Sequence, residues 1–526
     1  MLGFSRRVLL GAAVLASLCS LPAASQAQQG TVLNAVLEAE PSIFDPHFTT
    51  AYVSRTFGYA VYDTLFAMDA KGAIKPQMVE TYTVSDDKLT WTFTLRDGLL
   101  WHDGKPVTAA DCVASIKRWM PKASLGRILS DSVASIDATD ARSFTIKLKT
   151  PFGLMLDVLG RPNAPVPFMI PARLAATPGS ERITEVIGSG PFKFRPDLYR
   201  PGDQVVVERF KDYKPRSEPA DFLAGGKVAR VDQVVFKTMP DAATAASALQ
   251  TGEVDFLQFP SFDLLPVLEK NKQLQVISFG GDQTYEGYFR LNSLAKPFDD
   301  PEIRRVLWRL VDQVSVLEAL GLSDKYMTKG CRSFFMCGTP YETTAGGDIG
   351  INPSIEAAKE ALKKTKYAGE PIVVLQATDI DAPRISSAVL ADLLSRAGFK
   401  VDLQAMDWGT VLARRAKKDG WHVFGVHASG FDLALPLTHL YVANNCADYA
   451  GWHCDERLTQ KLSQFAKASD EKERKSIADD ISKIVYEITP AVMWGQFAQP
   501  AAYRRSLTNL IPSSVPVFWN VEKKAD

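Results

Sequence analysis

Residues 86–111 read DDKLTWTFTLRDGLLWHDGKPVTAAD and carry the clearest structural signal of the chain. Apolar side chains occupy alternate positions at Leu89, Trp91, Phe93 and Leu95. Because threonines fill the positions between them, the pattern predicts a half-buried strand. Two glycines and a proline then predict turns, and Thr108 stands three residues before Asp111 in a capping pattern. The stretch therefore predicts a strand, a turn cluster and a helix that begins after Thr108.

The N-terminal sequence, MLGFSRRVLLGAAVLASLCSLPAASQAQQ, has the composition of an export signal. Two arginines precede an apolar run over residues 8–21, and small residues follow at Ser25 and Ala27. This order predicts a signal peptide over residues 1–27 that is removed on export. The arginine pair also resembles a twin-arginine signal, so export by the Sec route and by the twin-arginine route both stay open.

The charge balance argues against a nucleic-acid partner. Removing Arg6 and Arg7 from the 60 basic residues leaves 58 against 60 acidic ones, so the exported chain carries almost no net charge. No stretch after the signal reaches the roughly 18 uninterrupted apolar residues of a spanning helix. About 500 residues remain, which predicts two or three folding units with a large core.

Five cysteines remain after the signal, and four of them form two close pairs. Cys331 and Cys337 stand six apart, while Cys446 and Cys454 stand eight apart, all in turn-rich sequence. In an oxidising compartment these spacings predict two local disulfides. A four-cysteine zinc site is the alternative, but structural zinc sites favour two to four residues between paired ligands. Cys112 follows a helix cap and is interpreted as a small buried hydrophobe.

Strand and helix patterns alternate through the rest of the chain. Residues 231–237 and 254–259 read as strands on either side of an alanine-rich helix over 241–250 that Asp241 caps, which predicts a parallel crossover. In SFTIKLKTPF, residues 143–152, apolar positions alternate and predict antiparallel sheet. Helices are further predicted after Ser354, up to Gly398 and, as a pair, over residues 455–488.

Several of these motifs resemble one family. The opening stretch resembles the signature of the family 5 solute-binding proteins of bacterial ABC importers, which include dipeptide-, oligopeptide-, glutathione- and nickel-binding proteins. IGSGPFKF, residues 187–194, resembles the family's G-[ST]-G-P-[FY] turn, in which glycine allows positive φ and proline fixes the exit. Gly252 to Asp255 match the motif G-x-x-D. Matched positions in a long motif over residues 288–312 are Asn292, Pro297, Phe298, Asp299, Arg304 and Asp312.

The resemblance implies an α/β fold of the type II periplasmic binding protein kind, with two lobes around a hinge and an extra subdomain in the first lobe. The hinge is expected where the chain crosses between lobes, near residues 280 and 495. The expected division is a signal peptide over 1–27, a first lobe over 28–280 plus 495–526 with the subdomain at about 70–187, and a second lobe over 281–494.

The function that the resemblance implies is the periplasmic substrate-binding component of an ABC importer. The lobes would close on a peptide or peptide-like solute, and the closed form would deliver it to a permease driven by ATPase subunits at the inner membrane. We expect a monomer that needs no cofactor and catalyses no reaction. A secreted hydrolase is the alternative from another class, but the sequence has no serine elbow, zinc helix motif or phosphate loop. A periplasmic chaperone or a receptor that senses solute without transport is a third hypothesis.

Asp432 is the leading candidate for a ligand-binding residue. Peptide-binding relatives place an aspartate four residues before a proline to pair with the ligand's amino group, and Asp432 and Pro436 keep this spacing. A buried carboxylate beside an ammonium forms a charge-assisted hydrogen bond. The alternative is a turn aspartate that caps the next helix. The sequence departs from the pattern at Ser429, where peptide binders often carry tryptophan, and at Leu435, where an acidic residue is usual.

Other candidates would complete the pocket. Trp408 and Trp421 are candidate aromatic walls, although either is equally interpreted as a core residue. Arg290 is the candidate partner for a ligand carboxylate, preferred over Arg384, because the planar guanidinium donates to both oxygens. His47, in Asp-Pro-His after the first strand, is a candidate cleft residue, and a proline-stiffened connection without ligand contact is its alternative.

Histidines in the second half of the chain raise the question of a metal. The four are His422, His427, His439 and His453. They would suit a nickel chelate as ligand, as in the nickel-binding relatives, and this is the alternative ligand class. No pair has helical ligand spacing with an acidic third member, so we expect no metal site.

Overall fold

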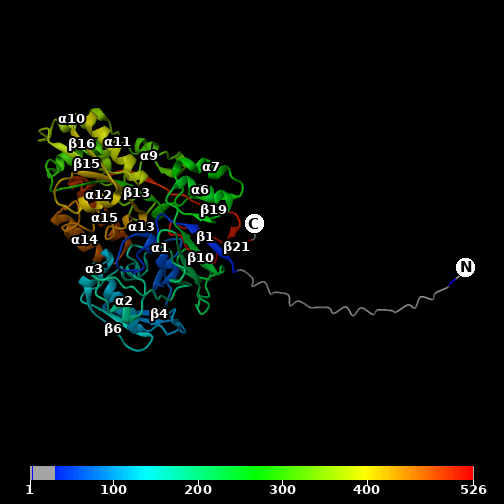
Figure 1. Ribbon diagram of the computed structural model, residues 1–526. Helices are drawn as coiled ribbons and strands as arrows, with labels where there is room; N and C mark the ends of the chain where they lie inside the picture. Colours follow the sequence, from blue (N-terminus) through cyan, green and yellow to red (C-terminus); the bar gives the residue numbers. More distant parts are fainter. Residues whose placement is uncertain (1–2, 4–29, 469, 525–526) are drawn as a thin grey trace.

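The computed structural model describes residue 3, residues 30–468 and residues 470–524. Apart from Gly3, the predicted signal peptide lies outside the described residues. Strands of the described chain gather into two larger sheets, one four-stranded sheet and two small hairpins. Figure 1 shows the second large sheet, with β15 and β16, at one end of the molecule and the four-stranded sheet, with β4 and β6, at the other.

The first large sheet contains seven strands in the order β12-β19-β11-β1-β10-β9-β8. β1 pairs in parallel with both β10 and β11, and α6 connects those two strands. The predicted strand–helix–strand unit is therefore present, with β1 between its strands. The bounds are β1 Val32–Val36, β8 Phe192–Phe194, β9 Gln204–Arg209, β10 Gln233–Lys237, α6 Ala242–Thr251, β11 Phe256–Leu257, β12 Leu274–Ile277 and β19 Ala501–Arg504.

The second large sheet contains six strands in the order β14-β18-β13-β17-β15-β16. Helix α11 packs on β15, β16 and β17, and α9 packs on β18. The strands are β13 Tyr285–Leu291, β14 Met327–Thr328, β15 Pro371–Ala377, β16 Lys400–Met406, β17 Val423–Ser429 and β18 Ala491–Phe497. The helices around it are α8 Pro301–Arg305, α9 Gln313–Ala319, α10 Ile355–Leu362, α11 Asp381–Ala397, α12 Trp408–Arg415, α13 Gly430–Leu433, α14 Glu456–Lys467 and α15 Glu471–Ile488.

The stretch over residues 86–111 lies in the four-stranded antiparallel sheet, whose order is β4-β5-β7-β6. Phe93 and Leu95 are buried and Trp91 is half-buried, which confirms the predicted strand. The Thr108 hydroxyl accepts from the Asp111 backbone N–H, and the Asp111 carboxylate accepts from the Thr108 backbone N–H, which confirms the capped helix. The bounds are β4 Val79–Val84, β5 Thr90–Leu95, α2 Ala109–Trp119, α3 Ser124–Ser132, β6 Val133–Ala138 and β7 Ser143–Leu148.

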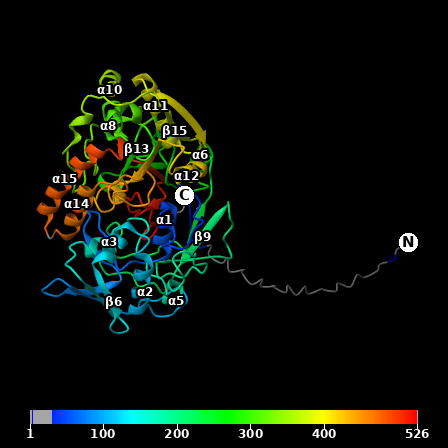
Figure 2. The same ribbon diagram turned by 90° about the vertical axis from the view of Figure 1, so that its left-hand side faces the viewer.

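The remaining elements are short and connect the sheets. Figure 2 shows the same separation of the two ends from the side, with α1 between them. The helices are α1 Tyr52–Val61, α4 Met155–Gly160, α5 Ala172–Ala175 and α7 Leu265–Lys270, and the small strands are β2 Phe66–Met68, β3 Ile74–Pro76, β20 Leu507–Thr508 and β21 Glu522–Lys523. The 3₁₀ turns are η1 Phe262–Leu264, η2 Gly281–Gln283, η3 Val306–Arg309, η4 Asp324–Tyr326 and η5 Gly347–Gly350.

The chain crosses between the two large sheets twice, after β12 and after β18. The first connection spans residues 278–284 and contains η2, as expected near residue 280. Because β18 extends to Phe497, the second connection spans residues 498–500 and lies just after the expected boundary at 495. The assignment of these residues to two lobes stays a prediction.

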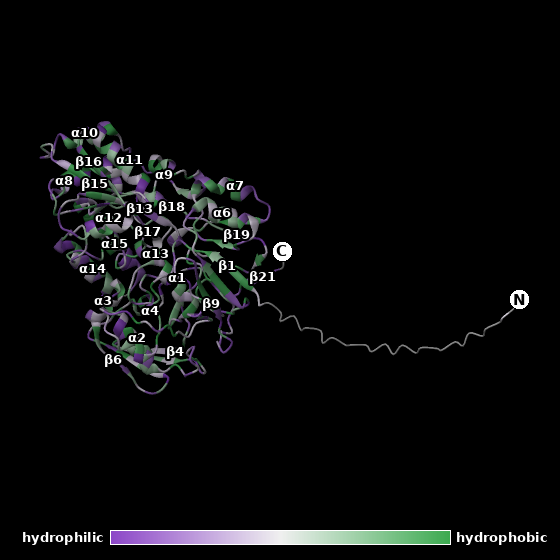
Figure 3. Ribbon diagram, viewed as in Figure 1, coloured by the Kyte–Doolittle hydropathy of each residue, from purple (hydrophilic) through white to green (hydrophobic). Residues whose placement is uncertain are grey.

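Polarity follows the layering of the elements. Figure 3 shows apolar residues concentrated in β1 and β19 and polar residues on the outer helix α14. In α14 only Leu458 and Phe465 are buried, so one narrow stripe faces the protein. Both predicted disulfides, Cys331–Cys337 and Cys446–Cys454, are formed, and Cys112 is buried and unpaired.

The turn over residues 187–194 requires glycine for a different reason from the positive φ that was predicted. Neither Gly188 nor Gly190 has a positive φ. Instead, a Cβ at Gly188 would lie 1.9 Å from the Val61 carbonyl oxygen at the end of α1. Gly190 donates its N–H to the same oxygen at 2.9 Å, and the His102 backbone N–H donates to the Gly188 carbonyl at 2.8 Å. Close backbone approach, rather than left-handed geometry, therefore requires glycine here.

Gly188→Ala is expected to destabilise the protein, because its methyl group would overlap the Val61 carbonyl and the backbone on both sides would have to shift. Overpacking of this kind costs about 1–3 kcal/mol. Denaturant unfolding followed by circular dichroism would measure the change in free energy. Gly280→Ala is the matched control, since Gly280 has an ordinary φ of −122° and no atom within 4 Å of its added Cβ. Equal stability of the two variants would contradict the argument.

Candidate ligand-binding site

Helix α13 follows the last residue of β17 and lies against the first connection between the sheets. The Gly430 N–H donates to the Thr284 carbonyl at 2.8 Å. A Cβ at Gly430 would come within 2.6 Å of the Asp282 carbonyl oxygen, so only glycine allows this approach. Strand β17 therefore ends before Gly430, and the next three residues leave the second large sheet, to which β17 belongs.

Phe431 is packed into the hydrophobic core of the first sheet, although it follows a strand of the second. Its side chain is fully buried in that core. Its ring stacks on Phe222, with centroids 5.9 Å apart, and the Arg55 guanidinium lies 5.8 Å from its ring centre. The Asn163 amide donates to the Phe431 carbonyl. Residues attached to both large sheets therefore meet at α13, and we call this region the junction.

Asp432 is buried at the same junction and accepts hydrogen bonds from residues outside its own sheet. Its Oδ2 accepts from the Tyr52 hydroxyl at 2.8 Å, and its Oδ1 accepts from the Asn163 amide at 3.0 Å. The Tyr52 hydroxyl in turn accepts from the Ser429 backbone N–H at 3.0 Å. Neither of these two bonds comes from the backbone of a following helix.

Two carboxyl groups face one guanidinium around this junction. Burial raises the pKa of the Asp432 carboxyl, and the positive charge of Arg55 opposes the rise. Burial also raises the pKa of Glu38, just after β1, to about 7, again against the charge of Arg55. Arg55 lies 4.5 Å from the Tyr52 ring centre and donates to the Pro162 carbonyl at 3.0 Å, while its Nε has no partner. When both acids are ionised, the junction has one excess negative charge.

Aromatic side chains border the junction at the start of β13. Tyr285 contacts the rings of Phe259 at 5.7 Å, His427 at 5.7 Å and Tyr52 at 6.5 Å, measured between centroids. Burial lowers the pKa of His427 to about 4, so its ring is neutral at neutral pH. We call the set of Glu38, Tyr52, Arg55, Asn163, Tyr285 and Asp432 the Asp432 site.

Ser429 contacts this site through its backbone N–H. Trp421 and His47, which were also predicted to bind the ligand, lie elsewhere. Trp421 is fully buried in a small core with Val411 and Phe424, as its core interpretation had it. His47 is also buried, with its Nε2 bonded to the Phe168 carbonyl at 2.8 Å. Its neighbour Asp45 forms a buried ion pair with Arg118. Both predicted residues have partners within the protein, and neither forms a hydrogen bond with Asp432.

Arg290 and Trp408 come together in a second cluster. Arg290 is 2% exposed, lies 4.0 Å from the ring centre of Tyr449 and donates to the Ala450 carbonyl. Trp408 begins α12, and the Arg415 guanidinium from the end of that helix lies 5.8 Å from its ring centre. Arg384, the other candidate, pairs with Asp381 at the surface.

His422 and His439 have hydrogen-bond partners within the protein, whereas His427 Nδ1 and His453 Nε2 are buried without one. His422 accepts from the Val373 N–H at 2.9 Å, and His439 lies 3.0 Å from the Tyr288 hydroxyl. Burial lowers the pKa of His439 to about 3 and that of His453 to about 4. Over residues 30–468 and 470–524, no three or more His, Cys, Asp or Glu side chains are grouped to hold a metal ion.

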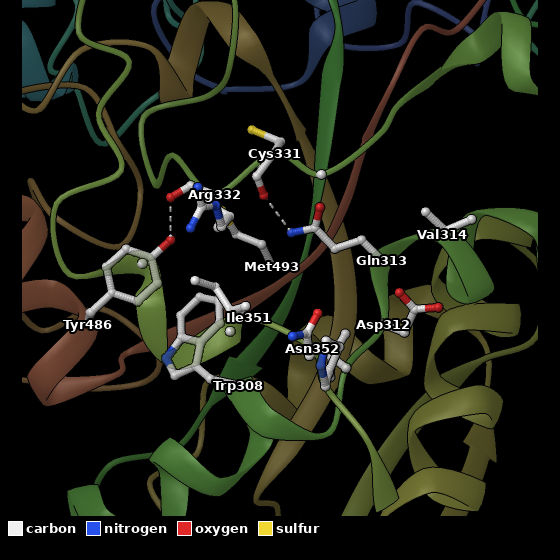
Figure 4. A pocket seen from close by; sticks show the side chains of 15 residues that line it. Trp308, Asp312, Gln313, Val314, Cys331, Arg332, Ile351, Asn352, Tyr486 and Met493 are labelled. Carbon is white, nitrogen blue, oxygen red and sulfur yellow. Dashed lines mark hydrogen bonds between the residues drawn. The ribbon is translucent and has the colours of Figure 1, made fainter. Parts of the chain in front are cut away.

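An open cavity of about 450 Å³ lies elsewhere, beside η3, α9 and α15 (Figure 4). Gln313 donates to the Cys331 carbonyl at 2.9 Å and Tyr486 donates to the Arg332 carbonyl at 2.8 Å, as the dashed lines in Figure 4 mark. The cavity shares no residue with the Asp432 site and, of the residues singled out from the sequence, it includes only Asp312 and Cys331.

A family model described as "Bacterial extracellular solute-binding proteins, family 5 Middle" matches residues 73–450. The chain belongs to this family. The "Probable peptide ABC transporter periplasmic-binding protein y4tO" of Sinorhizobium fredii is 40% identical over 496 residues, which cover 92% of each chain. The "Glutathione-binding protein GsiB" of Escherichia coli is 25% identical over 483 residues, which cover 88% of each chain.

Solved structures of family 5 proteins share the fold. The periplasmic binding protein AgaA of Agrobacterium tumefaciens, in complex with agropinic acid, superposes with a TM-score of 0.78 at 22% identity, over 94% of this chain and 99% of its own. DppA of Helicobacter pylori, in complex with the peptide STSA, gives 0.77 at 21% identity, over 94% and 98%. The predicted type II periplasmic binding protein fold is therefore confirmed.

Membership of family 5 confirms the predicted substrate-binding role, since the family consists of extracellular solute-binding proteins. Within the part of the chain that the structure describes, no helix has both the length and the apolar character needed to cross a membrane.

Glu38→Gln is expected to remove a pH-dependent destabilisation. The Glu38 carboxyl has a pKa of about 7 in the folded protein, against about 4.3 in an unfolded chain. The unfolded chain therefore releases its proton first, and stability falls as pH rises from about 4 to 7. The variant should match the native protein near pH 4 and exceed its stability at pH 8 by up to about 3 kcal/mol.

Thermal unfolding at the two pH values would measure this difference. Glu80→Gln, at an exposed position, is the control and should follow the native protein throughout. A constant difference between Glu38→Gln and the native protein at both pH values would contradict the assignment.

Proposed function

We propose that this family 5 protein is the periplasmic substrate-binding component of an ABC importer and that it captures a peptide or peptide-like small solute. The observation that carries the proposal is the buried Asp432 carboxylate, which leaves the second sheet and accepts from Tyr52 and Asn163. The names of the Sinorhizobium relative and of the glutathione-binding relative support a peptide-like ligand.

An amino group is the ligand feature that suits Asp432 best. Tyr52 and Asn163 give each carboxylate oxygen one hydrogen bond, which leaves acceptor capacity free, but they bring no positive charge. With Glu38 also ionised, Arg55 balances only one of two acids. A ligand ammonium would supply the missing charge together with a charge-assisted hydrogen bond, which is about twice as strong as a neutral one.

We propose further that the two large sheets are the cores of two lobes and that residues 278–284 and 498–500 form the hinge. A ligand held between residues of both lobes favours the closed state, because only that state contacts the ligand on both sides. The closed protein would then present a defined surface to a permease and its ATPase subunits in the inner membrane. The working form in this proposal is an exported monomer that lacks residues 1–27 and releases its ligand unchanged.

Asp432→Asn is expected to weaken binding of a peptide with a free amino group by about 30-fold or more, since losing one partner of a buried charge pair costs about 2 kcal/mol or more. Isothermal titration with trialanine and with N-acetyl-trialanine would measure it. The native protein should prefer the free amine, and the variant should lose that preference.

Asp419→Asn is the matched control, because Asp419 is exposed and its side chain forms no hydrogen bond with any described residue. It should bind both peptides as the native protein does. A variant at Asp432 that still prefers the free amine would show that the carboxylate does not bind the ligand's amino group.

Native mass spectrometry of the exported protein, purified without denaturation, is expected to show a co-purified peptide-like mass. Peptides incubated with the protein should be recovered uncleaved. Uptake of the identified solute should fall when the partner permease gene is deleted. Cleavage products would favour a hydrolase, and unchanged uptake would remove import from the function.

A further inference from the structure

Glu38 is an acid of the Asp432 site whose side chain has no partner among the described residues. It follows β1, and its backbone N–H donates to the Gln258 side chain at 3.1 Å. Its carboxylate is half-buried and forms no hydrogen bond or ion pair within the described chain. Asp432, by contrast, accepts one hydrogen bond on each oxygen. Because a partly desolvated carboxylate is unfavourable without donors, the donors for Glu38 have to come from outside the chain.

Aromatic side chains lie beside this carboxylate. Gln258, which binds the Glu38 backbone, directly precedes Phe259, and the rings of Phe259 and Tyr285 meet edge-on with centroids 5.7 Å apart. Burial raises the pKa of Tyr285, and the negative charge of Glu38 raises it further. The Glu38 carboxylate and the Tyr285 ring are therefore neighbours, and Phe259 is half-buried next to them.

His427 adds a third ring to this group but no charge. Tyr285 pairs with Ser429 across β13 and β17, so the side chain of His427, two residues before Ser429, leaves the sheet on the same face as Tyr285. Burial lowers the pKa of His427 to about 4. Its Nδ1 is buried without a hydrogen-bond partner. The second sheet therefore offers Glu38 a neutral aromatic surface and no counter-ion.

The charge balance around α13 also favours a further cation. Asp282, in η2, is half-buried, and its side chain forms no hydrogen bond or ion pair within the described chain. Arg161, whose charge acts on Asp282, is itself paired with Asp157 at 2.9 Å. When Asp282, Glu38 and Asp432 are all ionised, Arg55 balances only one of the three acids. A ligand amino group at Asp432 would balance a second acid and leave one negative charge.

We propose that Glu38, together with the rings of Tyr285 and Phe259, is a binding subsite for a cationic side chain of the ligand, and that the preferred solute is a short peptide with a basic residue. The carboxylate would accept a charge-assisted hydrogen bond, and the rings would add cation–π attraction. One short peptide can reach both acids, because the charges of Glu38 and Asp432 both act on Tyr285. This inference rests on the proposed function and deepens it by naming the substrate class.

The first experiment measures binding by isothermal titration at pH 8, where Glu38 is ionised. It compares the three tripeptides that contain one lysine and two alanines with counterparts in which norleucine, of similar length but uncharged, replaces lysine. In the native protein at least one lysine peptide should bind about tenfold or more tightly than its counterpart, as expected for a hydrogen bond to a charged group. Glu38→Gln should lose that preference. Equal affinities in the native protein, or a preference that persists in the variant, would overturn the proposal.

Glu40→Gln is the matched control. Glu40 stands two residues further along the same segment and is also half-buried. Its carboxylate already accepts from the Tyr199 hydroxyl at 3.3 Å and from the Gly202 N–H at 3.0 Å. The control should therefore keep the native preference for lysine. Loss of the preference in both variants would oppose a specific role for Glu38.

Proton release gives a second readout. The pKa of Glu38 is about 7, so about half of the free protein carries this proton at pH 7. A bound ammonium favours the ionised carboxylate, and the lysine peptide should therefore release about half a proton more than the norleucine peptide. Titration in buffers of different ionisation enthalpy would measure the difference. It should vanish in Glu38→Gln, and a difference that remains would assign the cation to another acid and overturn the proposal.

A third experiment does not depend on peptide binding. At pH 8, butylammonium should raise the melting temperature of the ligand-free native protein more than sodium does at equal ionic strength, and Glu38→Gln should lose that difference. If no peptide binds but butylammonium stabilises only the native protein, the proposed function fails and the subsite stands. If peptides bind but lysine brings no advantage over norleucine, the subsite fails alone.

Discussion

The burial of Phe431 and Asp432 between the two large sheets is the constraint on which the rest of the site depends. A buried carboxylate must have hydrogen-bond donors, since leaving it unpaired costs more than the bonds themselves contribute. Here the donors are Tyr52 and Asn163, which lie outside the second sheet. These bonds therefore fix α13, which follows a strand of the second sheet, against residues that lie outside that sheet.

A hydrogen-bonded side chain also joins the two regions where the chain passes between the large sheets. Gln496, near the end of β18, donates to the Thr284 hydroxyl at 3.1 Å and to the Cys337 carbonyl at 2.9 Å, and it accepts from the Cys337 N–H at 2.9 Å. One side chain thus joins the first connection, the strand before the second connection and the loop of the first disulfide. Helix α13 itself contacts η2, so it lies against the same first connection that Gln496 binds.

Sequence reasoning predicted what local patterns determine. Alternation and capping predicted β5 and α2, and turn-rich cysteine pairs predicted both disulfides. Asp432 was singled out by the resemblance to peptide-binding relatives, and its role in ligand binding stays a prediction. Its partners were not predicted, because Tyr52 and Asn163 are 380 and 269 residues away in sequence and carry no local signal. Trp421 could not be assigned to a wall or to a core from its neighbours alone, since both places favour an aromatic side chain. The Gly188 turn was recognised but misinterpreted, because a close approach to Val61 is a tertiary contact.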